Sequence, residues 1–268
     1  MKKTGIFLVP ILIIGAFMLM SNKLMASGAV NPTTMVIVAV VAFVLMLAIR
    51  PKKQPSSGNT ESTLSLLGDF AKDAFANDEK LSKQFDSAVS DYVNGMPRAA
   101  TSKLEKLQPL CKTDADNYAV SVALGMTKSS TGDYAAAIKL YNKAVVLHPT
   151  TELAMAIGNA QQRIGELEQA RDSYEFALDL DPSNIDARSS LATAYVADGM
   201  FEEAIEEARL ALEQDENHSS SLATCAICYG ILDDTLLCRS YTDKAVANGY
   251  NASKITDTIT ALKKKFKK

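Results

Sequence analysis

The sequence predicts an all-α protein in which a solenoid of stacked helix pairs follows a transmembrane hairpin of two helices. Two observations lead to this prediction. A pattern of small residues recurs at a spacing of 33 or 34 residues in the second half of the chain, and a fixed period of this length is typical of stacked helix pairs. Two long apolar runs occupy most of the first 50 residues, which predicts helices that span a membrane.

The first 50 residues predict a membrane hairpin with spans at about 4–25 and 33–50. Lys23 lies near the end of the first span, from where its long side chain can reach the interface. The other basic residues flank the hairpin: Lys2, Lys3, Arg50, Lys52 and Lys53. By the positive-inside rule both ends of the hairpin face the cytoplasm. The sequence therefore predicts a two-span protein of the cell membrane with a cytoplasmic solenoid.

A secretory signal peptide is the competing interpretation of the first apolar run. Two lysines, an apolar core and the small residues 26–29 resemble such a peptide and its cleavage site. Cleavage there would leave the second span in place. The solenoid would stay on the cytoplasmic side under either interpretation.

Three segments around the repeats predict a linker and two caps. Residues 51–61 are rich in proline, serine, glycine and asparagine, which predicts a flexible linker. Residues 62–80 predict a capping helix, because these apolar residues share one helical face: Leu64, Leu67, Phe70, Ala71, Ala74 and Phe75. Residues 253–268 predict a helix that caps the other end and finishes in a lysine tail.

The repeat pattern is clearest in three consecutive stretches. The first contains Gly125, Gly132, Ala137, Tyr141, Ala144 and Pro149. The second contains Gly158, Gly165, Ala170, Tyr174, Ala177 and Pro182. The third contains Ala192, Gly199, Ala204, Ala208 and Ala211, with Glu216 in place of the proline. Six matched positions at one period form a strong signal.

Each position in the pattern has a physical reason. Glycine and alanine let two antiparallel helices approach closely, and the second glycine of each stretch suits the left-handed residue of a tight turn. The proline ends the second helix, because it lacks a backbone donor and clashes with the preceding turn. The aromatic residues Tyr141 and Tyr174 are predicted to pack between one helix pair and the next.

These residues resemble the tetratricopeptide repeat family, and the resemblance covers about half the chain. It implies a right-handed helical solenoid that acts as a binding scaffold. Four repeats are expected at 118–150, 151–184, 185–218 and 219–252, the last with Asp233 where the turn glycine belongs. A divergent copy is expected at 81–117, with its small and apolar residues at Ala88, Gly95, Ala100, Leu104 and Leu107.

The charge of the chain is divided unevenly. Residues 1–60 carry six basic residues and no acidic one, so residues 61–268 carry 31 acidic against 22 basic residues and a net charge of −9. Nucleic acid requires a basic surface, so no nucleic-acid partner is expected. The lysine tail predicts either a solvated helix end or contact with anionic lipid: Lys263, Lys264, Lys265, Lys267 and Lys268.

No motif indicates catalysis or a bound cofactor. Cys225 and Cys228 form a C-x-x-C pair inside a predicted helix, with no second pair nearby, which favours buried thiols over a metal site. The sequence contains no glycine-rich phosphate loop, nucleophile elbow or zinc-protease motif. We therefore expect no cofactor, no metal and no enzymatic activity.

The family resemblance implies a concave groove lined by the first helix of each pair. Its lining positions correspond to Val122, Met126, Ser129, Met155, Asn159, Gln162, Arg163, Ser189, Thr193, Val196, Ala223 and Ile227. Asn159 and Arg163 are one helical turn apart, so together they can hold a peptide backbone or a carboxylate. The chaperone-binding members of the family place lysine or arginine at positions where this chain has Val122, Met155, Ser189 and Ala223, which argues against that mode.

The sequence thus predicts a membrane-anchored scaffold or adaptor that binds a protein or peptide partner, or copies of itself, at the cytoplasmic face. A groove of methionine, valine, serine and threonine suits an apolar or extended segment. The alternative is an accessory assembly subunit of a membrane enzyme or secretion complex, which would contact its partner through the hairpin.

Overall fold

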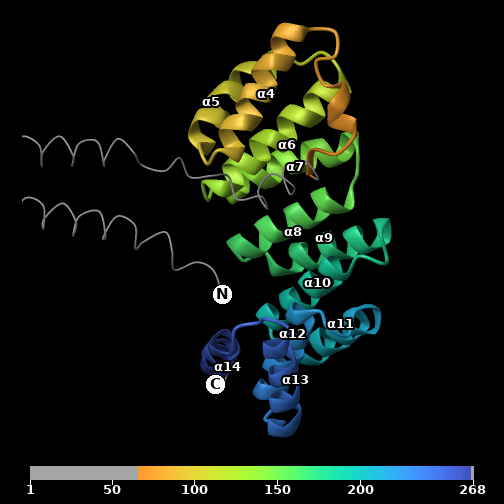
Figure 1. The fold of residues 1–268 in the computed structure, drawn as a ribbon, viewed down its shortest axis with the longest axis vertical. Helices are drawn as coiled ribbons and strands as arrows, with labels where there is room; N and C mark the ends of the chain where they lie inside the picture. The colour runs from red at the N-terminus through yellow and green to blue at the C-terminus, as the bar shows by residue number, and fades with distance from the viewer. Residues whose placement is uncertain (1–65, 267–268) are drawn as a thin grey trace, which may run out of the picture. The chain divides into compact units, whose positions relative to one another are not determined.

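The computed structural model of the chain describes residues 66–266, and these residues form helices and turns without a strand. The predicted hairpin at 1–50 and linker at 51–61 lie outside the described residues. Figure 1 shows the eleven α-helices of this part: α4 (Glu79–Val93), α5 (Pro97–Leu107), α6 (Asp114–Ser130), α7 (Tyr134–Leu147), α8 (Thr151–Ile164), α9 (Leu167–Leu180), α10 (Ile185–Asp198), α11 (Phe201–Gln214), α12 (Ser219–Ile231), α13 (Thr235–Ala247) and α14 (Ala252–Phe266). None of the helices within 66–266 meets the length and hydropathy that crossing a membrane requires.

The helices from α4 to α13 form five antiparallel pairs, each with a first and a second helix. The second helix of each pair packs against the first helix of the following pair: α5 on α6, α7 on α8, α9 on α10 and α11 on α12. The pairs follow one another along the stack from yellow to blue in Figure 1. The predicted all-α solenoid is confirmed for the described residues.

Glycine creates the turn inside the pairs. Gly165 ends α8 with a φ of 84°, and Gly199 ends α10 with a φ of 86°. After Gly165, the N–H of Glu166 donates to the carbonyl of Gln161 at 3.0 Å, so the last turn of the helix is capped by backbone bonds. Asp233 adopts the same left-handed conformation, with a φ of 61°, which aspartate tolerates better than most residues.

Helix approach within a pair depends on the other glycine of the pattern. A Cβ added at Gly125 would lie 2.4 Å from the ring of Tyr141, and one at Gly158 would lie 2.7 Å from the ring of Tyr174. The tyrosine therefore packs against the first helix of its own pair, where the sequence predicted a contact between pairs. Tyr174 also reaches the next pair, because it shares an apolar cluster with Leu191 of α10.

The N-terminal cap differs from the single helix predicted over 62–80. In its described part, Gly68 takes a φ of 63°, a short 3₁₀ helix η1 covers Phe70–Asp73, and Phe75 takes a φ of 58°. A helix cannot continue through these left-handed residues. Phe75 is 4% exposed, and its N–H donates to the Asp116 carboxylate at 2.7 Å. Burial of this side chain and that bond outweigh local helix propensity.

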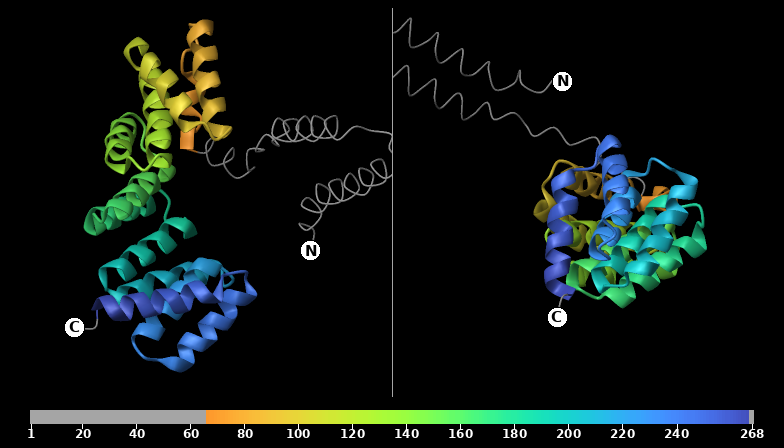
Figure 2. Two further views of the ribbon diagram at one scale, coloured as in Figure 1. Left: turned by 90° about the vertical axis from the view of Figure 1, so that its left-hand side faces the viewer. Right: turned by 90° about the horizontal axis from the view of Figure 1, so that it is seen from below.

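The C-terminal helix α14 packs along α12 and contacts α13 (Figure 2). Its buried residue is Ile255, and Ile259 and Leu262 extend the same apolar face into the cluster of α12. At its end, the ring of Phe266 lies edge-on to Phe201, with centroids 5.5 Å apart. This helix therefore covers one face of the last two pairs.

Candidate functional site

The candidate groove is formed by the first helices, and its ends are covered by the chain itself. Helix α6 is buried on all sides over residues 118–127, because η1 and the segment after it pack on the side that the second helices leave free. Helix α12 is covered in the same way by α14. Apart from the half-buried Ser129 near the end of α6, the accessible part of the predicted lining lies on α8 and α10.

Six of the predicted groove residues are buried, so their side chains are closed to a partner: Val122, Met126, Ser189, Val196, Ala223 and Ile227. Val122 and Met126 belong to one cluster with Leu67 and Phe75 of the N-terminal segment. Ala223, Ile227 and Val196 belong to the cluster that contains Ile255 of α14. Position in the repeat could not reveal this, because the covering segments lie outside the repeat pattern.

The remaining predicted residues differ in their access to solvent. Asn159, Arg163 and Thr193 are exposed, whereas Ser129, Met155 and Gln162 are half-buried. On α8, a spacing of three or four residues places four side chains on one side of the helix: Glu152, Met155, Asn159 and Arg163. On α10, Asp186 and Thr193 are exposed at the equivalent spacing. We call this surface the α8–α10 face.

Asn159 is held in a fixed orientation by a residue that the sequence analysis had assigned to packing. The hydroxyl of Tyr174 donates to Asn159 Oδ1 at 2.8 Å and lies 3.5 Å from Gln162 Oε1. Burial raises the pKa of Tyr174, so its hydroxyl stays protonated and remains a donor. With its oxygen occupied, Asn159 can offer its amide N–H groups to a carbonyl of a bound segment.

Arg163 provides the positive charge of the face. The guanidinium lies one turn from Asn159 and forms no ion pair with any residue of the described part of the chain. An unpaired arginine presents a planar set of donors that suits a carboxylate or a pair of carbonyls. Glu152 and Asp186 add negative charge at the other end of α8 and α10. The α8–α10 face is therefore polar and can form hydrogen bonds with the backbone of a bound segment, and Met155 offers it an apolar contact.

The lysine tail contacts the C-terminal end of α10. Lys265 donates from Nζ to the carbonyl oxygen of Ala197 on α10 at 2.8 Å, and Lys263 pairs with Asp233. Phe266 lies over Gly199. These groups contact the protein, while Lys267 and Lys268 fall outside the described residues. Lipid contact through the tail stays a prediction.

The cysteine pair lies in the core. Cys225 and Cys228 of α12 are fully buried, and burial raises the pKa of each thiol to about 12. A thiol with such a pKa is rarely the thiolate that binds metal or reacts. Within 66–266, no three His, Cys, Asp or Glu side chains are grouped as metal ligands would be.

Comparison with known proteins agrees with this fold. The tetratricopeptide repeat family matches at residues 118–150 and again at residues 165–226. These two segments are tetratricopeptide repeats. Among curated proteins, no sequence matches the chain.

Several solved structures resemble the stack. The crystal structure of MamA is 22% identical, with a TM-score of 0.55, and the match covers 60% of this chain and 93% of that one. MamA from Desulfovibrio magneticus RS-1 is 19% identical, with a TM-score of 0.56, and the match covers 68% of this chain and 96% of that one. YrrB is described as a tetratricopeptide repeat protein with an unusual peptide-binding site. It is 18% identical, with a TM-score of 0.54, and the match covers 68% of this chain and 93% of that one. At these identities the likeness shows the fold alone.

Proposed function

We propose that this protein is a scaffold that binds an extended segment of a partner protein on the α8–α10 face. One observation carries the proposal. Asn159 is oriented by the hydroxyl of Tyr174, and Arg163, which forms no ion pair with a described residue, lies one helical turn away. Repeat stacks expose such faces for binding, and YrrB is described as having a peptide-binding site. The role is binding and not catalysis.

The bound segment is expected to be short. The N-terminal segment and α14 cover the neighbouring first helices, so within 66–266 the accessible part of the predicted groove lies mainly on α8 and α10. A backbone carbonyl would accept from Asn159, and a carboxylate or second carbonyl would accept from Arg163. Met155 would contact an apolar side chain, since its flexible thioether adapts to irregular shapes.

We further propose that residues 1–50 anchor the scaffold in the cell membrane, with the stack in the cytoplasm. The uncharged runs and flanking lysines of the sequence support this part of the proposal. The alternative function, an accessory subunit that contacts its partner through the hairpin, rests on the same segment.

One experiment separates the two functions. The full chain would be expressed in its host with Asn159→Ala and Arg163→Ala together, and the co-purifying partner quantified by mass spectrometry. We expect a loss of roughly ten-fold or more, because each charge-assisted or oriented hydrogen bond contributes about 1–3 kcal/mol. The control pair is Lys139→Ala with Val146→Ala, both exposed on α7. Retention of the partner by the first pair would contradict the groove and favour the hairpin.

A further inference from the structure

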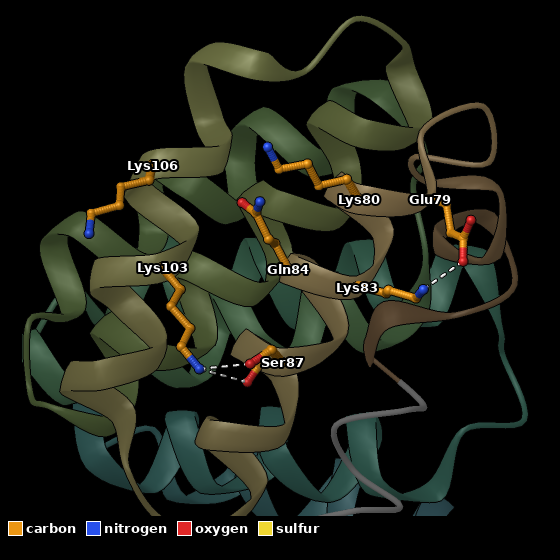
Figure 3. A pocket seen from close by; sticks show the side chains of 7 residues that line it. All are labelled: Glu79, Lys80, Lys83, Gln84, Ser87, Lys103 and Lys106. Atoms are coloured by element: carbon orange, nitrogen blue, oxygen red, sulfur yellow. Dashed lines mark hydrogen bonds and ion pairs between the residues drawn. The ribbon is translucent and has the colours of Figure 1, made fainter.

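A cleft of about 650 Å³ opens between α4 and α5 at the N-terminal end of the described stack (Figure 3). Glu79, Gln84 and Ser87 line it together with four lysines: Lys80, Lys83, Lys103 and Lys106. Glu79 is the single carboxylate among these lining residues. We call this site the lysine cleft.

The positive charge of the lysine cleft is only partly neutralised. Lys83 pairs with Glu79 at 2.6 Å, and Lys103 pairs with Asp91 at 2.6 Å. Lys80 and Lys106 form no ion pair with any residue between 66 and 266. Figure 3 shows their side chains, from α4 and α5, on either side of Gln84. Two ammonium groups therefore remain for a ligand.

The lysine cleft lies where the stack would otherwise receive another helix. Every later first helix packs against the second helix of the preceding pair, but within 66–266 no helix pair precedes α4. In the repeat register, Lys83 and Ser87 of α4 correspond to Leu153 and Ile157 of α8, which are buried in one cluster with residues of α7. The cleft thus has the position of a helix-binding slot with lysine in place of an apolar residue.

A polar end face alone keeps a repeat stack soluble, and charges of both signs would serve that purpose. Here the lining is four lysines to one glutamate, in a body that is otherwise acidic. Residues 61–262 contain 31 acidic against 17 basic residues. The excess of one sign indicates a complementary anionic occupant.

The same chain carries a matching helix face. On α9, four exposed carboxylates follow the spacing i, i+4, i+7 and i+11, which places them along one side of the helix: Glu168, Asp172, Glu175 and Asp179. None of them forms an ion pair with a described residue, and Arg171 of the same helix is paired with Asp198. We call this row the acidic stripe. Unpaired like charges one turn apart repel one another, so a cationic partner would stabilise them.

We propose that the lysine cleft of one molecule binds the acidic stripe of a second copy of this chain. A stripe of eleven residue steps is about 17 Å long, and the α4 side of the cleft, from Lys80 to Ser87, is about 11 Å long. The four carboxylates lie on one exposed side of α9, where they can approach the exposed Lys80 and Lys106 of the cleft. Because the two surfaces differ, the contact is head to tail and can continue from copy to copy.

The test uses charge exchange in the full chain, purified in an uncharged detergent and followed by sedimentation velocity over a range of concentrations. Wild type is expected to self-associate. The variants Lys80→Glu/Lys106→Glu and Glu168→Lys/Asp179→Lys are each expected to associate at least ten-fold more weakly. Their equimolar mixture is expected to recover association, because each intact surface meets its partner in the other molecule. Association of wild type should also weaken as the Debye length falls from about 10 Å at 0.1 M salt to about 3 Å at 1 M salt.

The control variant is Lys112→Glu/Lys139→Glu, which makes the same change in net charge at two exposed lysines outside the cleft. Equal weakening by this control, failure of the mixture to recover association, or a monomeric wild type would each overturn the proposal. Binding of anionic detergent micelles by a monomeric wild type, lost in Lys80→Glu/Lys106→Glu, would assign the cleft to an anionic surface instead. The groove variant Asn159→Ala/Arg163→Ala should associate normally, so failure here and failure of the proposed function are distinguishable.

Discussion

At the scale of single residues, the stack depends on the contact between a glycine and a tyrosine in the same pair. Gly158 leaves room for the ring of Tyr174, which is fully buried. That ring position also aims the hydroxyl at Asn159. One glycine therefore determines both helix packing and the orientation of a candidate binding residue.

Replacement of Gly158 by alanine is expected to destabilise the protein by about 1–3 kcal/mol, since the new Cβ would overlap the ring of Tyr174. Alanine favours a helix by about 1 kcal/mol over glycine, so a purely local effect would have the opposite sign. The measurement is chemical unfolding of the full chain. In a Tyr174→Leu background the cost should shrink, and an unchanged cost would rule out the ring contact.

At the scale of elements, the N-terminal segment is attached to α6 by one carboxylate. Asp116 caps α6 with Thr113, and it also accepts from the N–H of Phe75 and of Lys112. Burial raises the pKa of Asp116, but hydrogen bonds from the backbone of Lys112, Phe75 and Thr113 outweigh this and hold the pKa below its usual value. The charged form is therefore favoured by folding.

The lowered pKa of Asp116 predicts that the folded protein loses stability in acid. The contribution of Asp116 to the free energy of unfolding is fully present above its pKa in the unfolded chain, about 4. It is lost as the pH falls through its lower pKa in the folded protein. The variant Asp116→Asn should lose about 1–3 kcal/mol at neutral pH, because it leaves backbone donors unsatisfied, and its stability should change less between pH 5 and pH 2. Asp114→Asn, at an exposed position of the same first turn, is the control for the helix dipole. Equal effects of the two variants in unfolding at both pH values would refute the role of Asp116.

At the scale of the whole molecule, the helix pairs within 66–266 contact their neighbours in the stack and do not share a single core. Their buried apolar residues fall into several clusters along the chain. In such an arrangement, damage at one end remains local. The two ends are stabilised by different segments, the one around Phe75 and α14, and both segments also limit the groove to α8 and α10.

The variant Ile255→Ala is expected to release α14, at a cost of about 2–5 kcal/mol for a buried aliphatic side chain. Hydrogen exchange should rise in α12, α13 and α14, and should stay low in α6 and α8. Val246→Ala, a residue 44% exposed on α13, should leave exchange unchanged. A uniform rise along the chain would show that the stack unfolds as one unit.

The sequence predicted the repeat segments well, because their information is local and periodic. Small residues at Gly125 and Gly158 and turn glycines at Gly165 and Gly199 each satisfy a contact within one pair. The family resemblance gave Asn159 and Arg163 as groove positions, and both are exposed in the structure. It predicted neither the hydrogen bond from Tyr174 nor the burial of half of the groove positions.

What the sequence by itself determined is the helix pairs and their register, since these follow from steric requirements repeated every 33 or 34 residues. The tertiary structure alone decided which surfaces stay open. The segment around Phe75 and helix α14 return to cover α6 and α12, and α4 and α5 join lysines 23 residues apart, Lys80 and Lys103, in one cleft. Local apolar faces predicted that residues 62–80 and 253–268 cap the stack. Which helices these segments cover depends on contacts between residues distant in the chain, and no repeated local pattern encodes such contacts.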